Sequence, residues 1–190
     1  HSSLWLLAAA TFDATTGIAT VYQLPGTAWP NHPAAGMASA QTGAHSVAAN
    51  DLALMIAATP GLNGAPSSEH FNGKIEAPRI YDRVLSAEEI TGLAQGRIPP
   101  DPVAAWDFSL RMQTRELEDT SGNDLHGHTR HFPKRAVPGH GWDGSEMDFA
   151  RAPGHYGAIH FHDDDLDDAG WTVSFEYTLP DALKSGIYAA

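Results

Sequence analysis

The sequence of 190 residues contains no cysteine, which excludes disulfide bonds, thiolate zinc sites, iron–sulfur clusters and a cysteine nucleophile. Basic residues are also scarce, because 11 Lys and Arg stand against 23 Asp and Glu and give a formal net charge of −12. A chain of this sign repels phosphate backbones and anionic lipid, so neither nucleic acid nor a membrane surface is an expected partner. No apolar run approaches the ~20 residues that a membrane helix needs, and the lack of cysteine fits a cytoplasmic location.

Glycine and proline are frequent instead, and the 18 glycines and 13 prolines divide the chain into short apolar runs. Such runs favour strands over long amphipathic helices, so the sequence predicts an all-β fold, with 42% hydrophobic residues available for a core. One short helix is expected after Ser86, because Glu89 completes a capping box with it. The predicted strands are residues 4–12 and 18–24, which form a hairpin, and residues 46–50, 103–108, 155–162 and 171–179. Residues 52–59 are expected to form a strand buried on both faces, and residues 71–81 a strand pair or one kinked strand.

The prolines of residues 98–102 (IPPDP) mark the best linker in the chain, because proline disfavours both helix and central strand. The sequence therefore predicts one β-rich module over residues 1–97 and a second over residues 103–190, which either completes the first sandwich or forms its own. The chain starts without Met and stops after a strand-like run, so we expect it to be a piece of a longer protein.

Residues 71–90 (FNGKIEAPRIYDRVLSAEEI) closely resemble the closing strand and short helix of laminin-G-like, concanavalin A-like jelly rolls. The usual pattern there is F-x-G-x-I-x-x-x-R-I-Y-x-R-x-L-S-x-x-E-I, and nearly every fixed position matches. The resemblance implies a jelly-roll β-sandwich. In such a fold Phe71 and Ile75 would face the core, and Leu85 and Ile90 would fix the helix over the sandwich edge.

A second resemblance lies in residues 133–144 (PKRAVPGHGWDG), 156–171 (YGAIHFHDDDLDDAGW) and 185–189 (SGIYA). These strings resemble the large (beta) subunit family of N,N-dimethylformamidase, whose members are several times longer. The resemblance implies an accessory β-sandwich portion of an amide hydrolase that cleaves N,N-dimethylformamide to dimethylamine and formate. It also implies an iron held by two tyrosines and a glutamate beyond Ala190, so no catalytic residue is assigned to this chain. Whether the chain alone is an enzyme stays open, and its implied partners are other domains of the same subunit, a small partner subunit and further copies in a homo-oligomer.

A histidine pair and an acidic run suggest a metal site. His160 and His162 stand at i, i+2 on a predicted strand, which places both imidazoles on one face. Asp163, Asp165 and Asp167 follow directly and offer carboxylate ligands, either to an ion held with the histidines or to calcium in an irregular loop. The structural alternative is that the histidines end the strand and the aspartates form a solvated turn.

Trp29 is the best candidate for an exposed aromatic side chain, because it lies in a loop rich in proline and glycine between Pro25 and Gly36. With an ion near the aspartates it would make a lectin-like carbohydrate-binding module, the alternative function that the sequence leaves open. Equally, Trp29 can pack as a lid over its own sandwich. Glycan hydrolysis is disfavoured, because the nearest carboxylate group, residues 116–119, runs into a turn.

Overall fold

The computed structural model describes residues 5–26, 35–47, 52–61, 67–162, 171–184 and 186. Within them the chain is all-β apart from one α-helix and one 3-10 helix, which confirms the predicted class. None of the described helices is long and apolar enough to cross a membrane. The elements in chain order are β1 (Leu6–Asp13), β2 (Ile18–Pro25), β3 (Gly36–Gln41), β4 (Gly73–Glu76), β5 (Arg79–Ile80), α1 (Ala87–Leu93), β6 (Ala104–Asp107), β7 (Glu116–Asp119), β8 (Gly127–His128), β9 (Lys134–Val137), η1 (Pro153–Tyr156) and β10 (Ala158–Phe161).

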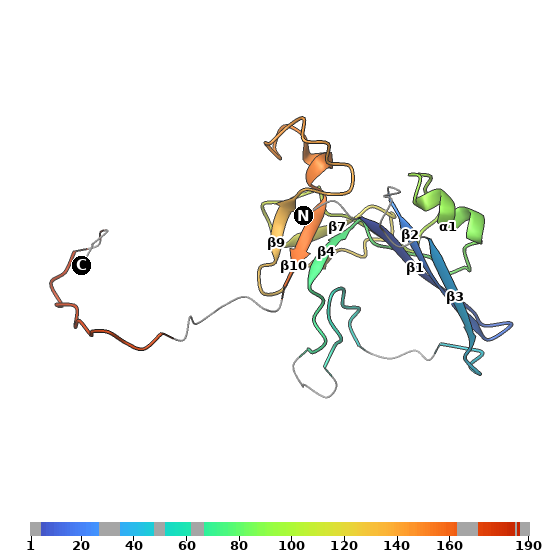
Figure 1. Ribbon diagram of the computed structural model, residues 1–190, viewed down its shortest axis with the longest axis horizontal. Helices are drawn as coiled ribbons and strands as arrows, with labels where there is room; N and C mark the ends of the chain where they lie inside the picture. Colours follow the sequence, from blue (N-terminus) through green and yellow to red (C-terminus); the bar gives the residue numbers. More distant parts are fainter. Residues whose placement is uncertain are drawn as a thin grey trace.

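The first sheet is antiparallel and has the order β1-β2-β3 (Figure 1). The hairpin expected from the first two apolar runs is confirmed, and its turn is built by Asp13. The Asp13 carboxylate accepts hydrogen bonds from the Thr15 N–H at 2.9 Å and the Thr16 hydroxyl at 2.8 Å. Gly17 completes the turn at a φ of +70°, a conformation that favours glycine.

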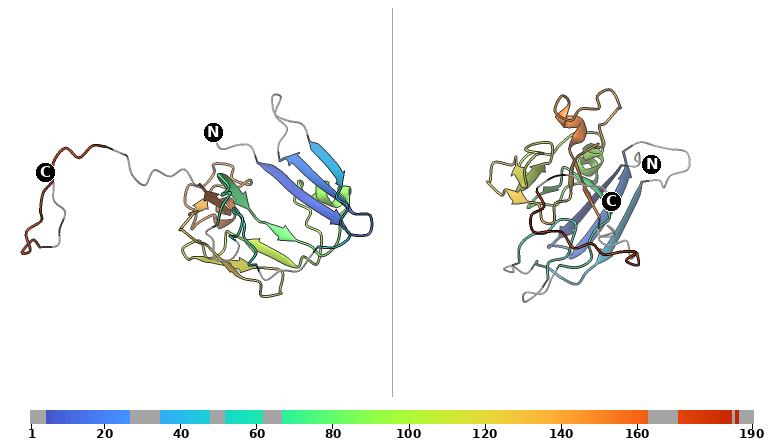
Figure 2. Two further views of the ribbon diagram at one scale, coloured as in Figure 1. Left: turned by 90° about the horizontal axis from the view of Figure 1, so that it is seen from below. Right: turned by 90° about the vertical axis from the view of Figure 1, so that its left-hand side faces the viewer.

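Two further antiparallel sheets combine strands from both sides of residues 98–102. Their orders are β4-β10-β9 and β5-β6-β7-β8. In the first, Ile75 of β4 lies opposite Ile159 of β10, and in the second, Arg79 of β5 lies opposite Ala105 of β6. Figure 2 shows these strands side by side, with the first sheet at one end of the molecule. The module boundary and the concanavalin A-like assignment stay predictions.

The core sits where these two sheets meet. Ala104, Trp106, Phe108 and Ile159 are buried against one another, and Ile56, Ile75, Leu117 and Phe161 pack around them. Trp106 also places its indole N–H 2.8 Å from the Leu125 carbonyl, so the polar atom of this buried ring is satisfied. Burial of Trp106 agrees with its expected position inside a strand.

Helix α1 begins as the sequence predicts. The Ser86 hydroxyl accepts a hydrogen bond from the Glu89 N–H at 3.2 Å, and the Glu89 carboxylate accepts one from the Ser86 N–H at 2.8 Å. Arg83 pairs with the same carboxylate at 2.8 Å. Ile90 is fully buried and Leu85 is buried, so the expected apolar pair does fix the helix.

The strand predicted over residues 52–59 does not form. This segment contributes one isolated bridge, between Thr59 and Ser68, and Leu52 and Leu54 are exposed instead of buried on both faces. An apolar run becomes a strand only where its backbone groups find a neighbouring edge, and here pairing is confined to one residue. The adjoining prediction over residues 46–50 lies largely outside the described residues, and residues 46 and 47 are not in a strand.

Residues 171–179 were also predicted as a strand, and the structure places them in none. Figure 1 shows this segment apart from the three sheets. Trp171 is 87% exposed. No strand of the described residues pairs with the segment, so the expected strand has no neighbouring edge to bond with.

Candidate functional site

The two histidines of the predicted metal site are neighbours in space. His160 lies in β10 and His162 directly follows that strand, with 4.8 Å between the ring centroids. In the sheet register, His160 stands opposite Lys74 of β4 and Lys134 of β9. Residues directly opposite in neighbouring strands share a face, so the ammonium groups of Lys74 and Lys134 lie on the same face as His160. Their positive charges disfavour binding of a cation there.

The remaining candidate residues lie outside the described part of the chain. Asp163, Asp165 and Asp167 are in this group, and so is Trp29. In the ranges that the structure covers, no three His, Asp or Glu side chains are arranged to hold one metal ion. The ion site and the sugar-stacking tryptophan therefore stay predictions.

A second histidine site, which the sequence analysis did not identify, joins Glu76 at the end of β4 to His140 in the loop after β9. The Glu76 Oε2 atom accepts hydrogen bonds from the His140 N–H at 2.6 Å and from Nδ1 at 2.8 Å. The Glu76 side chain is 11% exposed and that of His140 is 70% exposed. A carboxylate that fixes Nδ1–H orients the ring and directs Nε2 toward another partner, as in histidines that bind metals or exchange protons.

Two glycines make room for the Glu76 carboxylate. A Cβ at Gly139 would overlap the carboxylate, and one at Gly157 would lie 3.1 Å from Oε1. The Trp5 ring meets His140 edge-on, with 6.5 Å between the centroids. The pair thus connects the start of β1, the end of β4 and the loop after β9. The two partners occur in the two strings of family resemblance, but neither string indicates that they meet.

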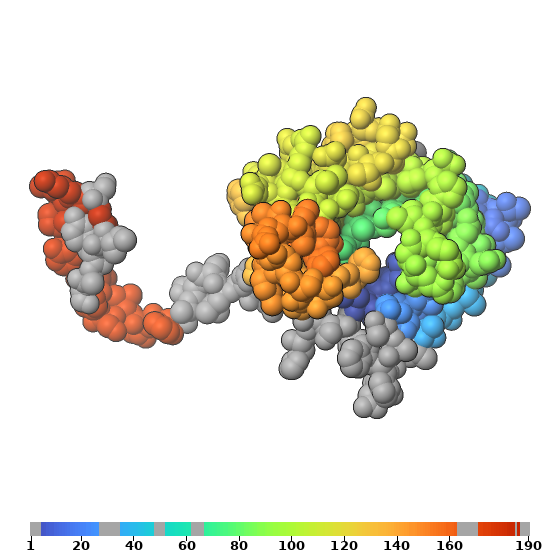
Figure 3. Space-filling model, turned by 90° about the horizontal axis from the view of Figure 1, so that it is seen from above, coloured from blue at the N-terminus to red at the C-terminus, as the bar shows by residue number. Residues whose placement is uncertain are grey.

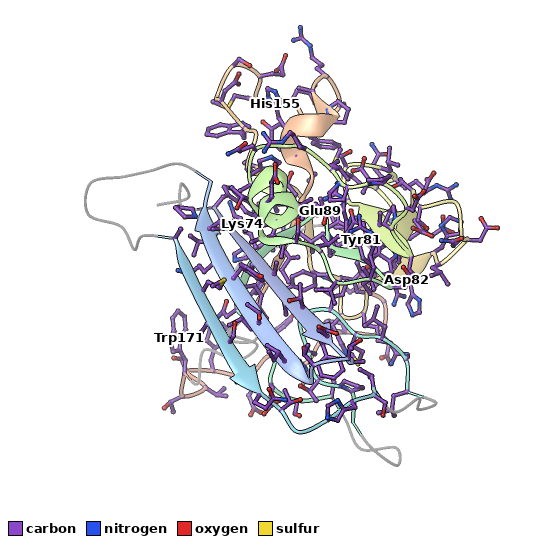
Figure 4. All side chains as sticks on the ribbon, turned by 90° about the vertical axis from the view of Figure 1, so that its right-hand side faces the viewer. Lys74, Tyr81, Asp82, Glu89, His155 and Trp171 are labelled. Atoms are coloured by element: carbon purple, nitrogen blue, oxygen red, sulfur yellow. The ribbon has the colours of Figure 1, made fainter. Side chains whose placement is uncertain are left out.

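A further acid–histidine pair lies beside η1. His155, labelled in Figure 4, has its Nδ1 atom 3.6 Å from Asp143 Oδ1. The hydroxyl and N–H of Ser145 lower the pKa of Asp143, and the charge of His155 adds to this effect. The Asp143 carboxylate therefore stays ionised near neutral pH.

Arg135 holds a loop of backbone carbonyls. Its guanidinium donates to the carbonyl oxygens of the segment between β6 and β7, namely those of Phe108 (3.1 Å), Leu110 (3.0 Å), Arg111 (3.4 Å), Thr114 (2.9 Å) and Glu116 (2.7 Å). Burial lowers the pKa of the Arg135 guanidinium, yet arginine keeps its charge in proteins. The fork of donors fits a ring of carbonyls, so this side chain shapes the loop from inside.

Asp119 is the buried carboxylate of the second region. It accepts hydrogen bonds from the N–H groups of Ala105 (2.9 Å), Ser121 (3.0 Å) and Leu125 (3.0 Å), and from the Ser121 hydroxyl at 2.8 Å. Burial by itself raises the pKa of Asp119, but these hydrogen bonds outweigh it and hold the pKa well below its usual range. The residue therefore organises the turn after β7 as an ion.

Glu116 and Glu118, the nearest candidates for the carboxylate pair of a glycosidase, form salt bridges with Arg111 at the surface. Arg111 binds Glu116 at 2.5 Å and Glu118 at 3.0 Å, both from β7. All three side chains are a third or more exposed. Glu116 and Glu118 thus belong to a solvated strand end, as expected of residues 116–119, but the same expectation is wrong for Asp119, which is buried.

Comparisons with known proteins cover part of the chain. Residues 134–190 match the family described as N,N-dimethylformamidase beta subunit-like, C-terminal. The chain is 46% identical over 127 residues to the N,N-dimethylformamidase beta subunit of Paracoccus aminophilus, and 42% identical over 127 residues to that of an Alcaligenes species. Each alignment covers 63% of this chain and 17% of the relative, so the chain spans less than a fifth of the length of these proteins.

The fold and its polar clusters define an all-β protein in which the buried Asp119 and the half-buried Arg135 hold backbone groups. Within that class, the chain is similar to the beta subunits of N,N-dimethylformamidase. The resemblance found in the sequence strings is thereby confirmed.

Proposed function

We propose that this chain is an accessory, structural β-sandwich portion of the large subunit of an amide hydrolase. The reaction of that subunit is the hydrolysis of N,N-dimethylformamide, in which water cleaves the C–N bond to give formate and dimethylamine. The observation that carries the proposal is the 46% identity to a relative whose name states this substrate. The name also describes the relative as a beta subunit, which supports a small partner subunit and contacts with other domains for this chain.

The use of the buried charges supports an accessory role. Asp119 and Arg135 form hydrogen bonds with neighbouring backbone groups, and Glu76 fixes a loop through its contacts with His140. Groups engaged in this way are unavailable to a substrate. No step through iron is assigned to the described residues, because the resemblance implies iron ligands beyond Ala190.

The test is dimethylamine release from N,N-dimethylformamide by the complete polypeptide that carries this sequence, with its metal content measured, beside the 190-residue chain. We expect activity in the complete polypeptide and none in the chain alone. Activity in the chain alone would overturn the accessory role. A metal-loaded complete polypeptide that releases no dimethylamine would contradict the assignment of N,N-dimethylformamide as the substrate.

Two variants sharpen this test in the complete polypeptide. Glu76→Gln weakens a buried contact, while Glu88→Gln changes an exposed carboxylate on α1. An accessory role predicts that Glu76→Gln lowers the yield of folded enzyme and leaves KM for N,N-dimethylformamide equal to that of Glu88→Gln. A KM that changes only in Glu76→Gln would place this part of the chain at the substrate.

The proposal extends to a divalent ion held by His160 and His162 with Asp163, Asp165 and Asp167. A thermal shift with zinc that His162→Gln removes identifies the histidine-containing site, and one with calcium that Asp165→Asn removes identifies the oxygen site. No shift with either ion argues against both. Titration with a glycan array, with and without calcium, separates the lectin-like alternative, because only that function predicts sugar binding through Trp29.

A further inference from the structure

One face of the first sheet is apolar and exposed. Side chains that share this face follow from the register, in which Ala10 of β1, Val21 of β2 and Ala38 of β3 form one row across the strands. Val21 is 54% exposed and the two alanines are exposed. The face, called the apolar face below, consists of Leu6, Ala8, Ala10, Phe12, Ala19, Val21, Gln23, Pro25, Gly36, Ala38 and Ala40.

The opposite face of the same sheet is less exposed and mixes apolar side chains with polar ones, since it consists of Leu7, Ala9, Thr11, Asp13, Ile18, Thr20, Tyr22, Leu24, Met37, Ser39 and Gln41. Its corresponding row is Thr11, Thr20 and Ser39, and the hydroxyls of Thr20 and Ser39 are hydrogen-bonded at 2.8 Å. Figure 4 looks onto this sheet, and Figure 3 shows a hollow between its blue strands and the green and orange parts of the chain. A contiguous apolar surface on a folded domain marks a place where another element packs.

The C-terminal segment of residues 171–179 carries the second uncovered apolar surface. Its odd-numbered side chains are all apolar or aromatic and its even-numbered ones are polar, so an extended conformation separates the two kinds. The apolar set is exposed, comprising Trp171 (87%), Val173 (69%), Phe175 (71%), Tyr177 (71%) and Leu179 (66%).

We propose that the apolar face of β1-β2-β3 is the docking surface for residues 171–179 of the same chain. This inference goes beyond the proposed function and does not depend on the substrate. The two surfaces complement each other in size, because the sheet offers mainly alanine and glycine and the segment offers large side chains, which lets two layers interdigitate at the ~10 Å spacing of packed sheets. Their lengths also agree, since the segment has nine residues and β1 and β2 have eight each.

The connection allows this contact. β10 ends at Phe161, and the chain from there to Trp171 can span about 30 Å when extended. On docking, the even-numbered polar residues, including Glu176, face water while the odd-numbered ones meet the sheet. Only one polar side chain, Gln23, belongs to the apolar face in the described strands, so almost no polar group is desolvated.

Disulfide formation tests the proposal cleanly, because the chain has no cysteine of its own. Phe175→Cys is combined in turn with Ala10→Cys, Val21→Cys and Ala38→Cys on the apolar face. The matched controls combine it with Thr11→Cys, Thr20→Cys and Ser39→Cys, one residue away on the other face. A disulfide needs Cβ atoms about 4 Å apart, so we expect at least one apolar-face pair to form a cross-link within one chain roughly ten times faster than any control pair.

Equal rates on the two faces, or no cross-link on either, would overturn the proposal. A cross-link between two chains would overturn it in favour of a second copy as the occupant. Cleavage by chymotrypsin after Phe175 and Tyr177 gives a readout without cysteine. We expect Ala38→Glu to speed that cleavage by about tenfold relative to Ser39→Glu, because a charge on the apolar face opposes docking, and equal rates would count against the proposal.

Discussion

Glu76 and His140 are 64 positions apart and share two hydrogen bonds, both ending on the Glu76 Oε2 atom. One comes from the His140 backbone and the other from its ring, so the carboxylate fixes both the loop and the imidazole. The contact holds the end of β4 against the loop that follows β9, and Gly139 lies directly against the same carboxylate.

The tight approach at Gly139 gives the first prediction. Gly139→Ala should lower the free energy of unfolding by about 1–3 kcal/mol, because the new methyl group overlaps the Glu76 carboxylate and forces it away from His140. Gly141→Ala is the matched control, since a Cβ there meets nothing within 4 Å. Urea denaturation of both variants measures the difference, and equal stabilities would contradict the role of the glycine.

Replacement of Asp119 tests the turn after β7. Asp119→Asn should destabilise the protein by about 2–3 kcal/mol, because an amide has one acceptor oxygen and cannot serve all the donors that the ionised carboxylate serves. Asp124→Asn changes an exposed carboxylate whose side chain is 93% exposed, and it should have little effect. Thermal or urea unfolding compares the two variants.

The lowered pKa of Asp119 also predicts a pH dependence. A carboxyl group with a lower pKa in the folded than in the unfolded state contributes stability above its unfolded pKa of about 3.9, and this contribution is lost as the pH falls through the folded value. The difference in unfolding free energy between the natural chain and Asp119→Asn should therefore be constant from pH 7 to pH 5 and shrink below pH ~4. A difference that stays constant to pH 3 would show that the charge does not matter.

Arg135 should not tolerate lysine. Arg135→Lys keeps the charge but replaces a planar fork with a single ammonium, which cannot reach five carbonyl oxygens spread over residues 108–116. We expect a loss of about 1–3 kcal/mol, because the part-buried carbonyls of Phe108 and Leu110 and the three more exposed ones lose their donor. Arg130→Lys, at an exposed position, serves as the control in the same denaturation experiment.

Loss of the N-terminal cap of α1 should lower the free energy of unfolding by less than the changes above. Ser86→Ala should cost about 1 kcal/mol of stability, and Ser86→Asp should retain most of it, because aspartate also accepts the Glu89 N–H. A titration of Glu89 followed by NMR should give a pKa of about 2, lowered by the hydrogen bonds from Arg83 and Ser86. The stability that Glu89 provides is thus present above pH ~4.5 and is lost toward pH 2. A cap without effect in Ser86→Ala would contradict the capping box.

The features that could be predicted from the sequence depend on residues that are close together in the chain. Ser86 and Glu89 are three positions apart, and the turn from Asp13 to Gly17 lies within five, so the helix start and the hairpin follow from local hydrogen bonds. The burial of Trp106 follows from its place in a short apolar strand. The family resemblance also rests on continuous strings, which is why the comparisons confirm it.

The features that could not be predicted depend on residues far apart in the chain. The residues around Glu76 do not predict its contact with His140, and those around Arg135 do not predict the carbonyls that it binds. Conversely, residues 52–59 and 171–179 have the composition of strands, but composition alone does not supply a neighbouring edge. Of the candidate site, the sequence placed His160 beside His162 and missed the lysines opposite, which the strand register brings there.

The pairing of β4 with β10 has a consequence for synthesis on the ribosome. Ile75 is translated long before its partner Ile159, so the nascent chain carries the edge of β4 without this neighbour until residue 159 has been synthesised. Such an edge is a template for pairing with other chains. A ribosome that pauses before residue 158 would thus prolong the time during which the nascent chain exposes this unpaired edge.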